Sequence, residues 1–248
     1  MKVTKIVNGK KTTVLVKKPA PKAKPATQLA FQVNDLAFSS EGWFAATTAG
    51  VLVSHDHGTT WKSTAGKEEL VKQPALSLEA SANGSQVWSI SQHNLLYSQD
   101  GGKSWEAKEI SFATAGNLRL HRVDDSNLYI TSNAGLYASK DAGRTWNRAD
   151  IRDLQFQDVA GSGSALVVSL QRHGLLSSVD GGKSYQRVNT PSAEGYFPAV
   201  HVRRDGSVVA ASATEGLLQF DPDARSADSS NSVGVSALAP TNKQTPRK

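Results

Sequence analysis

The sequence predicts an all-β protein assembled from repeated supersecondary units, and three observations support this prediction. An octapeptide with the pattern S-x-D-x-G-x-[ST]-[WY] occurs four times, with its aspartates 44, 41 and 39 residues apart. A short apolar run precedes each copy, and strand-like runs alternate with turn residues between copies. No stretch shows convincing helical periodicity. Repeats of about 40 residues are typical of stacked units that bury a shared core.

The four octapeptides place a Ser, an Asp, a Gly, a Ser or Thr, and a closing aromatic residue at matching positions. They comprise Ser54, Asp56, Gly58, Thr60, Trp61, Ser98, Asp100, Gly102, Ser104, Trp105, Ser139, Asp141, Gly143, Thr145, Trp146, Ser178, Asp180, Gly182, Ser184 and Tyr185. Two copies contain Asp-Gly-Gly, a strong hairpin signal because Gly accepts the positive φ of tight turns. The Asp and Ser/Thr oxygens suit the exposed N–H groups of a turn. The closing aromatic ring is expected to pack against a neighbouring repeat.

This pattern resembles the Asp-box, also called the bacterial neuraminidase repeat, of β-propellers of the sialidase, sortilin and photosystem II assembly factor kinds. The resemblance covers roughly residues 29–223. It implies that each box lies between the third and fourth strands of a blade, at the periphery and away from the central face. A fifth unit keeps the lead-in Gly216-Leu217-Leu218, but Phe220, Pro222 and Ala224 replace the expected Ser, Asp and Gly. We predict a five-bladed propeller, with six blades or an incomplete ring as alternatives.

Each predicted blade begins with an inner strand that leads through a turn into a second strand. The inner strands are expected at Val33–Ser39, Ala75–Ala82, Leu118–Asp125, Leu154–Ala160 and Phe197–Arg204. The second strands are expected at Gly42–Thr47, Gln86–Ile90, Asn127–Thr131, Ala165–Leu170 and Ser207–Ala211. We predict that Leu29–Gln32 closes the ring as the outer strand of the last blade. Val233–Leu238 could add an edge strand.

Charge divides the chain into three parts that the overall charge of +6 conceals. Residues 1–28 hold eight lysines and no acid, residues 29–223 hold 16 basic and 21 acidic residues, and residues 224–248 have a net charge of +3. We therefore predict a basic Lys/Pro-rich N-terminal tail (1–28), an Asp-box propeller (29–223) and a disordered C-terminal tail (224–248). Within the first tail, Val3–Val7 and Thr12–Val16 flank an Asn-Gly pair and indicate a small hairpin. The lysines suit contact with an anionic polymer or surface, or simply a solvated tail.

Several classes of protein are disfavoured by what the sequence lacks. It has no cysteine, so disulfides and thiolate metal sites are excluded. No run approaches the ~18–20 apolar residues of a transmembrane helix. Met1–Lys18 lacks the apolar core of a signal peptide, which predicts a cytoplasmic protein, or an exported one if the start is misassigned. We find no phosphate-cradling Gly-rich loop, nucleophile elbow or Cys-His pair, and expect no cofactor.

Glycoside hydrolysis is the enzymatic activity that the resemblance raises. The arginine motif of the sialidase family, [FY]-R-[IL]-P, has no match here, which disfavours sialidase activity. Other glycosidases need two carboxylates about 5–10 Å apart. Candidate carboxylates on or near the inner strands are Asp35, Glu79, Asp124, Asp125 and Asp158. The competing interpretation is that these are turn and rim residues.

Two histidines occupy equivalent places in the third and fifth units. His121 and His201 are each followed four residues later by an aspartate. On a central channel, such histidines could bind an anion or a metal. Descent from one ancestral blade explains the match equally well, so they are candidates for the central face and no metal ligand is assigned.

Two functions remain from different classes. The first is a non-catalytic protein-interaction or assembly scaffold, similar to the photosystem II assembly factor and sortilin branch, with a protein or peptide as its partner. The alternative is a carbohydrate-active enzyme, glycoside hydrolase-like, that uses inner-strand carboxylates. The absence of catalytic motifs favours the first, and no catalytic residue is assigned.

Overall fold

The structure is a computed structural model that describes residues 2–7, 10–15, 31–64, 72–110, 112, 116–151, 155–188, 190, 195–225 and 233–237. These residues contain the strands β1 to β22 and no helix. The strands form one two-stranded hairpin and five four-stranded sheets. All pairs are antiparallel, and the strands of each four-stranded sheet pair in chain order as a meander. The all-β prediction is confirmed.

The five sheets follow one another along the chain. The first contains β3 (Val33–Phe38), β4 (Trp43–Thr47), β5 (Gly50–Ser54) and β6 (Lys62–Ser63). The second contains β7 (Ala75–Ala80), β8 (Val87–Ser91), β9 (Asn94–Ser98) and β10 (Glu106–Glu109). The third contains β11 (Arg119–Arg122), β12 (Leu128–Ser132), β13 (Gly135–Ser139) and β14 (Asn147–Arg148). The fourth contains β15 (Phe156–Ser162), β16 (Ala165–Leu170), β17 (Leu175–Ser178) and β18 (Gln186–Arg187), and the fifth β19 (Ala199–Val202), β20 (Val208–Ser212), β21 (Gly216–Arg225) and β22 (Val233–Ala237).

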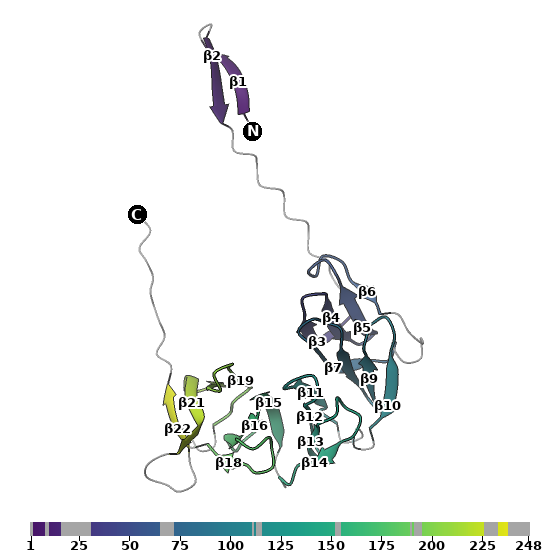
Figure 1. The fold of residues 1–248 in the computed structure, drawn as a ribbon, viewed down its shortest axis with the longest axis vertical. Helices are drawn as coiled ribbons and strands as arrows, with labels where there is room; N and C mark the ends of the chain where they lie inside the picture. Colours follow the sequence, from purple (N-terminus) through teal and green to yellow (C-terminus); the bar gives the residue numbers. More distant parts are fainter. Residues whose placement is uncertain are drawn as a thin grey trace.

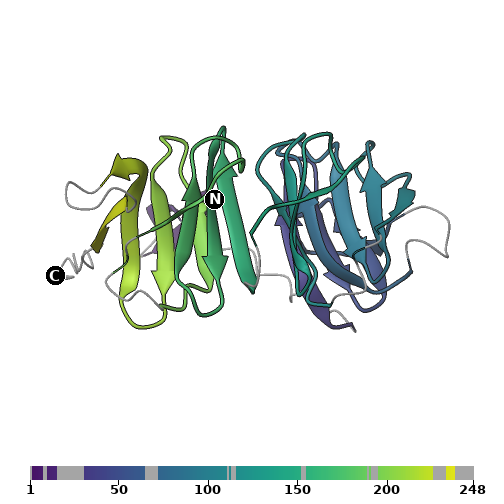
Figure 2. The same cartoon turned by 90° about the horizontal axis from the view of Figure 1, so that it is seen from below.

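The sheets are arranged as the blades of a β-propeller around an open arc, with β3, β7, β11, β15 and β19 on its inner side (Figure 1). Seen from below, they stand upright beside one another (Figure 2). The five predicted inner strands are confirmed, each slightly displaced or shortened at its ends. Five sheets agree with the predicted number of units. In the part of the chain that the structure describes, however, the first and last sheets do not meet (Figure 1).

The hydrophobic core is divided into four clusters, and each cluster lies between two consecutive sheets. Representative pairs, in chain order, are Phe44 with Leu78, Trp88 with Leu120, Tyr129 with Val159, and Val167 with Val200. Successive residues of a strand point to opposite faces of its sheet, so they contribute to different clusters. Val87 and Trp88 of β8, for example, pack on opposite faces of the second sheet. Among the described residues, none of the four clusters joins the fifth sheet to the first.

The last sheet differs from the prediction. Phe220 replaces the first octapeptide serine and is only 4% exposed. Because its side chain cannot accept the turn N–H groups, β21 runs on to Arg225 and pairs with β22, Phe220 opposite Val235. The prediction that Leu29–Gln32 supplies this outer strand is therefore wrong. The Gln32 carbonyl accepts the N–H of Thr48 in the first sheet instead, at 3.0 Å.

Both tails contain strands. Residues 233–237, assigned from sequence to the disordered tail 224–248, form β22, in agreement with the edge strand proposed for Val233–Leu238. In the N-terminal tail, β1 (Lys2–Val7) and β2 (Lys10–Leu15) pair as the expected hairpin. The predicted Lys/Pro-rich stretch and residues 226–232 and 238–248 lie outside the described residues. The described part of the chain contains no helix long and apolar enough to span a membrane.

Candidate functional site

Each octapeptide is a closed hydrogen-bonded turn after the third strand of its sheet. In the third copy, the Ser139 hydroxyl donates to Asp141 Oδ1 at 2.8 Å and accepts the N–H of Gly143 at 2.8 Å. The Asp141 carboxylate also accepts the N–H and hydroxyl of Thr145, at 2.8 and 2.6 Å. The Trp146 indole donates to the Gly143 carbonyl at 3.1 Å. The other three copies repeat this pattern, except that Tyr185 has no indole to donate.

The octapeptide carboxylates are strongly held as anions. The N–H and hydroxyl of Thr60 lower the pKa of Asp56 to about 2, and the hydroxyl and N–H of Ser104 lower that of Asp100 to about 2. These are bonds to the charged form of the carboxylate, which favour ionisation. The donors of these hydrogen bonds all belong to the same octapeptide as the carboxylate. The polar groups of each octapeptide carboxylate are thus engaged within its own turn.

The octapeptides contact the end of the sheet that lies opposite to the start of the inner strand. In the second, third and fourth sheets, an octapeptide N–H donates at 2.9 Å to the turn between the first and second strands: Gly101 to Ser85, Ala142 to Ser126, and Gly181 to Ser164. Since that turn follows the inner strand, the octapeptides and the start of each inner strand lie at opposite ends. A site at the inner-strand starts is thus separated from them.

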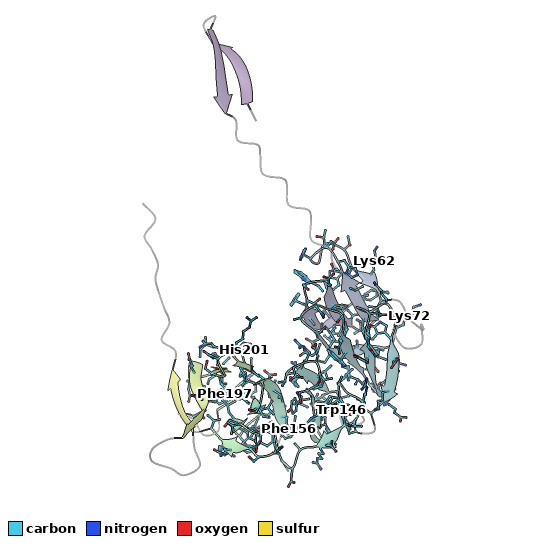
Figure 3. The ribbon with its side chains drawn as sticks, viewed as in Figure 1. Lys62, Lys72, Trp146, Phe156, Phe197 and His201 are labelled. Carbon is cyan, nitrogen blue, oxygen red and sulfur yellow. The ribbon has the colours of Figure 1, made fainter. Side chains whose placement is uncertain are left out.

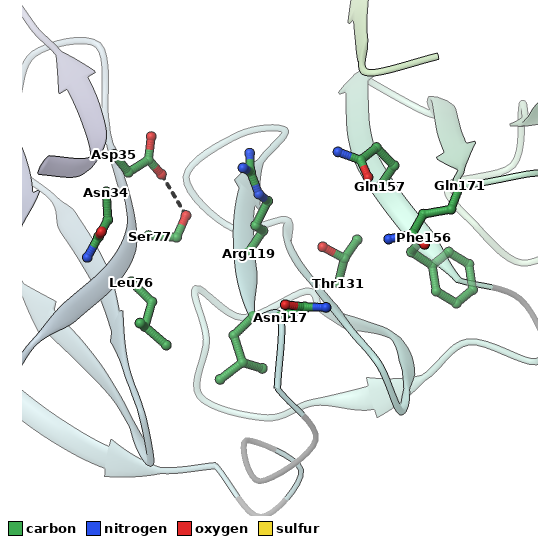
Figure 4. A pocket seen from close by; sticks show the side chains of 11 residues that line it. Asn34, Asp35, Leu76, Ser77, Asn117, Arg119, Thr131, Phe156, Gln157 and Gln171 are labelled. Carbon is green, nitrogen blue, oxygen red and sulfur yellow. Dashed lines mark hydrogen bonds between the residues drawn. The ribbon is translucent and has the colours of Figure 1, made fainter. Parts of the chain in front are cut away.

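Such a site exists as a cavity of about 420 Å³ on the inner side of the arc. The lining side chains face a common space from several sheets (Figure 4). They belong to Asn34, Asp35, Leu76, Ser77, Asn117, Leu118, Arg119, Thr131, Phe156, Gln157 and Gln171. Arg119 is the one cationic residue of this lining and Asp35 the one acidic residue. The remaining lining side chains are amides, hydroxyls and the apolar Leu76, Leu118 and Phe156.

The cavity has polar groups free to bind. Asn34 donates to the Ala75 carbonyl at 2.7 Å and Asn117 to Asn133 at 3.1 Å, so these amides are partly engaged. Within the described residues, the side chains of Arg119, Gln157 and Gln171 have no hydrogen-bond partner. Sequence analysis did not single out these three. Arg119 and Gln157 are polar residues at the start of an inner strand and Gln171 directly follows a second strand, a pattern too common in the sequence to be specific.

Two of the candidate carboxylates join neighbouring blades. Asp35 Oδ2 accepts the Ser77 hydroxyl at 2.7 Å and the N–H of Leu78 at 3.1 Å. Asp158 Oδ2 accepts the N–H of Val200 at 2.9 Å. All three bonds run from one inner strand to the next, 42 to 43 residues along the chain. These carboxylates therefore connect consecutive blades.

The other candidate carboxylates are engaged in turns or with a cation. Asp124 accepts the N–H groups of Ser126 and Asn127, both at 2.8 Å, as the turn interpretation predicted. Asp125 lies 3.1 Å from Arg122. Burial raises the pKa of Glu79 to about 7, although Arg122 acts in the opposite direction.

The two candidate histidines have different surroundings. Register places them equivalently, His121 opposite Tyr129 and His201 opposite Val209. His121 is 7% exposed, with Nε2 3.1 Å from Thr131 Oγ1 and Nδ1 3.2 Å from Asp158. His201 is exposed on the last sheet (Figure 3). Among the described residues, no group of three His, Cys, Asp or Glu side chains is arranged to hold a metal ion.

Comparison with known proteins supports the β-propeller class. The family model "Sortilin, neurotensin receptor 3" of the Sortilin-Vps10 kind matches residues 49–150. No curated protein matches the chain. The fold therefore rests on the sheet architecture and on solved structures.

Solved structures of two kinds are similar to this chain. A structure titled "YCF48 bound to D1 peptide" has a TM-score of 0.60 at 18% identity, covering 88% of this chain and 74% of that one. YCF48 from Cyanidioschyzon merolae has a TM-score of 0.56 at 15% identity, covering 86% and 73%. The GH74 enzyme of Niastella koreensis has a TM-score of 0.57 at 15% identity, covering 76% of this chain and 35% of that one. At these identities the likeness concerns the fold, and the similar structures include both a peptide-bound protein and an enzyme.

Proposed function

We propose that this chain is a non-catalytic interaction module that binds an extended peptide segment of another protein in the cavity on the inner side of the arc. The four octapeptides then serve as Asp-boxes that stabilise the blades and take no part in binding. Their satisfied hydrogen bonds and their position at the opposite end of the sheets support this division of roles.

The chemistry of the cavity suits a peptide. An amide side chain offers both donors and an acceptor, as a peptide backbone does, so Gln157 and Gln171 can pair with either group of a bound strand. Arg119 adds donors for a carbonyl or carboxylate of the peptide. Leu76 and Phe156 provide apolar contact. The volume of about 420 Å³ falls within the range of about 300–1,000 Å³ for binding pockets.

One observation carries the choice of a binding module over a hydrolase. Glycosidases place two carboxylates across the scissile bond. Asp35 is the one acidic residue that lines the cavity, and its oxygens accept three bonds, from Leu36 N–H, Ser77 and Leu78 N–H. This carboxylate has a structural role and lacks a carboxylate partner in the lining. The structure titled "YCF48 bound to D1 peptide" lends support, because a protein of similar fold binds a peptide.

The experiment is a selection of random displayed peptides on the full-length chain. Selected peptides are then tested against a variant with Arg119→Gln and Gln157→Ala, and against Lys62→Ala as a surface control outside the cavity. The proposal expects peptides whose binding is lost in the double variant and kept in the control. Release of reducing ends from xyloglucan or another β-glucan by the wild type, abolished by Asp35→Asn, would favour the hydrolase instead.

A further inference from the structure

The first sheet exposes one face, whereas the equivalent face of the second sheet is buried. The two sheets can be aligned on the first serine of their octapeptides, Ser54 and Ser98. In this alignment, Leu36 and Phe38 of β3 are equivalent to Leu78 and Ala80 of β7. Leu78 and Ala80 pack against the first sheet and are 2% and 5% exposed. Leu36 and Phe38 are 45% and 57% exposed. The first sheet therefore lacks the neighbour that covers this position elsewhere.

Aromatic rings extend this exposed face, which we call the β3 face and define as Leu36, Phe38, Trp43 and His57. Phe38 and Trp43 form an edge-to-face pair with centroids 4.9 Å apart, and Trp43 meets His57 at 5.6 Å. Aromatic side chains contribute strongly to cores and interfaces because each can bury a large apolar area. An exposed contiguous patch of this kind marks an interaction site.

The fifth sheet ends the arc with the opposite face open. Val200 and Val202 pack against the fourth sheet. The alternating residues Ala199 and His201 lie on the other face and are exposed, and Leu217 of the paired strand β21 is 50% exposed. His201 is equivalent to His121, which the fourth sheet covers. The two open faces thus border the gap in the ring (Figure 1).

We propose that the N-terminal hairpin of the same chain, β1 with β2, docks on the β3 face and completes the ring as a two-stranded partial blade. In the structure, β1 and β2 pair only with each other among the described strands. An isolated two-stranded hairpin is at best marginally stable in water. A hairpin at this position in the chain therefore needs a surface, and the β3 face is an uncovered surface next to it in sequence.

Tether length and charge both favour this occupant. Residues 16–30 join the hairpin to Phe31, which precedes β3, and 15 residues can span up to about 50 Å. A short tether gives the hairpin a high effective concentration at the β3 face. The hairpin strands carry Lys2, Lys5, Lys10 and Lys11 and no acid, whereas residues 29–223 have an excess of acidic residues, 21 against 16 basic. Opposite charge attracts the hairpin to the propeller.

Disulfide trapping tests this docking in the full chain, which contains no native cysteine. Thr4→Cys and Lys5→Cys, at successive positions of β1 so that both faces of the strand are sampled, are each combined with Phe38→Cys. Matched variants carry Lys62→Cys in place of Phe38→Cys, since Lys62 is exposed in β6 of the same sheet. Oxidation is followed at low protein concentration on non-reducing gels, and hydrogen exchange of the wild-type β1 and β2 amides is measured in parallel.

The proposal predicts a disulfide within one chain for at least one variant that carries Phe38→Cys, formed about tenfold or more faster than in the matched Lys62→Cys variant. It also predicts protection of the hairpin amides from exchange. Equal rates for the Phe38→Cys and Lys62→Cys variants, or unprotected hairpin amides, would overturn it. Disulfides that form between chains alone would assign the β3 face to a second copy and also overturn it.

Discussion

The carboxylate of Asp158 on β15 accepts the backbone N–H of Val200 on β19 at 2.9 Å, and so connects the fourth blade to the fifth. The same carboxylate meets His121 of the third blade at 3.2 Å. One side chain thus contacts three consecutive blades. The sequence made Asp158 a candidate catalytic carboxylate. Its contacts with Val200 and His121 give it a role in blade packing that requires no catalysis.

Asp158→Ala should destabilise the protein by about 1–3 kcal/mol, because the Val200 N–H loses its acceptor inside the inner-strand layer. Thermal unfolding measures the change. Gln157→Ala, the adjacent cavity residue, serves as the control and should unfold close to the wild type. An Asp158→Ala protein with the wild-type unfolding temperature would remove this carboxylate from the account of blade packing.

Ala142→Gly should stabilise the protein by about 0.5–1 kcal/mol. Ala142 has a φ of 60°, a left-handed conformation that L-residues adopt at a cost, and two of the other octapeptides carry Gly at this position. Ala138→Gly in β13, which is not among the positive-φ residues, should have the opposite effect. Chemical denaturation distinguishes the two. Equal destabilisation by both changes would show that the turn carries no strain at Ala142.

Acid should unfold the protein through the octapeptides. Although burial acts in the opposite direction, the hydroxyl and N–H of Thr145 lower the pKa of Asp141 to about 2, as the corresponding bonds do for Asp56 and Asp100. A folded-state pKa below the unfolded value gives stability that is present above about pH 4 and is lost as the pH falls through about 2. Unfolding free energies measured from pH 5 to pH 2 should fall steeply, and less steeply in Asp141→Asn. Parallel pH profiles for the two proteins would contradict this assignment.

Glu79 should produce the opposite pH dependence. Burial raises the pKa of Glu79 to about 7 in the folded protein, so its contribution to stability is present below about pH 4.5 and is lost as the pH rises through 7. Glu79→Gln should therefore match the wild type near pH 4.5 and exceed it at pH 8, by on the order of 2 kcal/mol. Glu106→Gln, on the exposed strand β10, provides the control. A Glu79→Gln variant no more stable than the wild type at pH 8 would exclude this coupling.

Much of the fold could be predicted because it depends on local patterns that recur. The serines and aspartates of the octapeptides specify their turns through bonds spanning two to four residues, such as Ser139 to Asp141 and Asp141 to Thr145. The apolar runs before the octapeptides indicated the strands that precede them, β5, β9, β13 and β17. Where the pattern degenerates, at Phe220, the prediction of the outer strand failed, because the chain continued as β21 and took β22 from the C-terminal residues.

The cavity could not be predicted from the same information. Its lining combines residues such as Asn34, Arg119 and Gln157 from three different blades, and no local pattern distinguishes them from other polar residues at strand ends. The roles of Asp35 and Asp158 were hidden for a related reason. The bonds that these carboxylates make to the next inner strand join residues 42 to 43 positions apart, so the partners become evident only when consecutive inner strands lie side by side.

The separation of a binding cavity from a structural set of octapeptides is tested most directly by the affinity of a selected peptide for two variants. Both variants are measured by calorimetry at a temperature where each is folded. Arg119→Gln should weaken binding by about tenfold, the equivalent of about 1.4 kcal/mol for one lost charge-assisted contact. Asp141→Ala should lower the unfolding temperature and leave the dissociation constant unchanged. A peptide whose affinity falls with Asp141→Ala and is indifferent to Arg119→Gln would contradict the account.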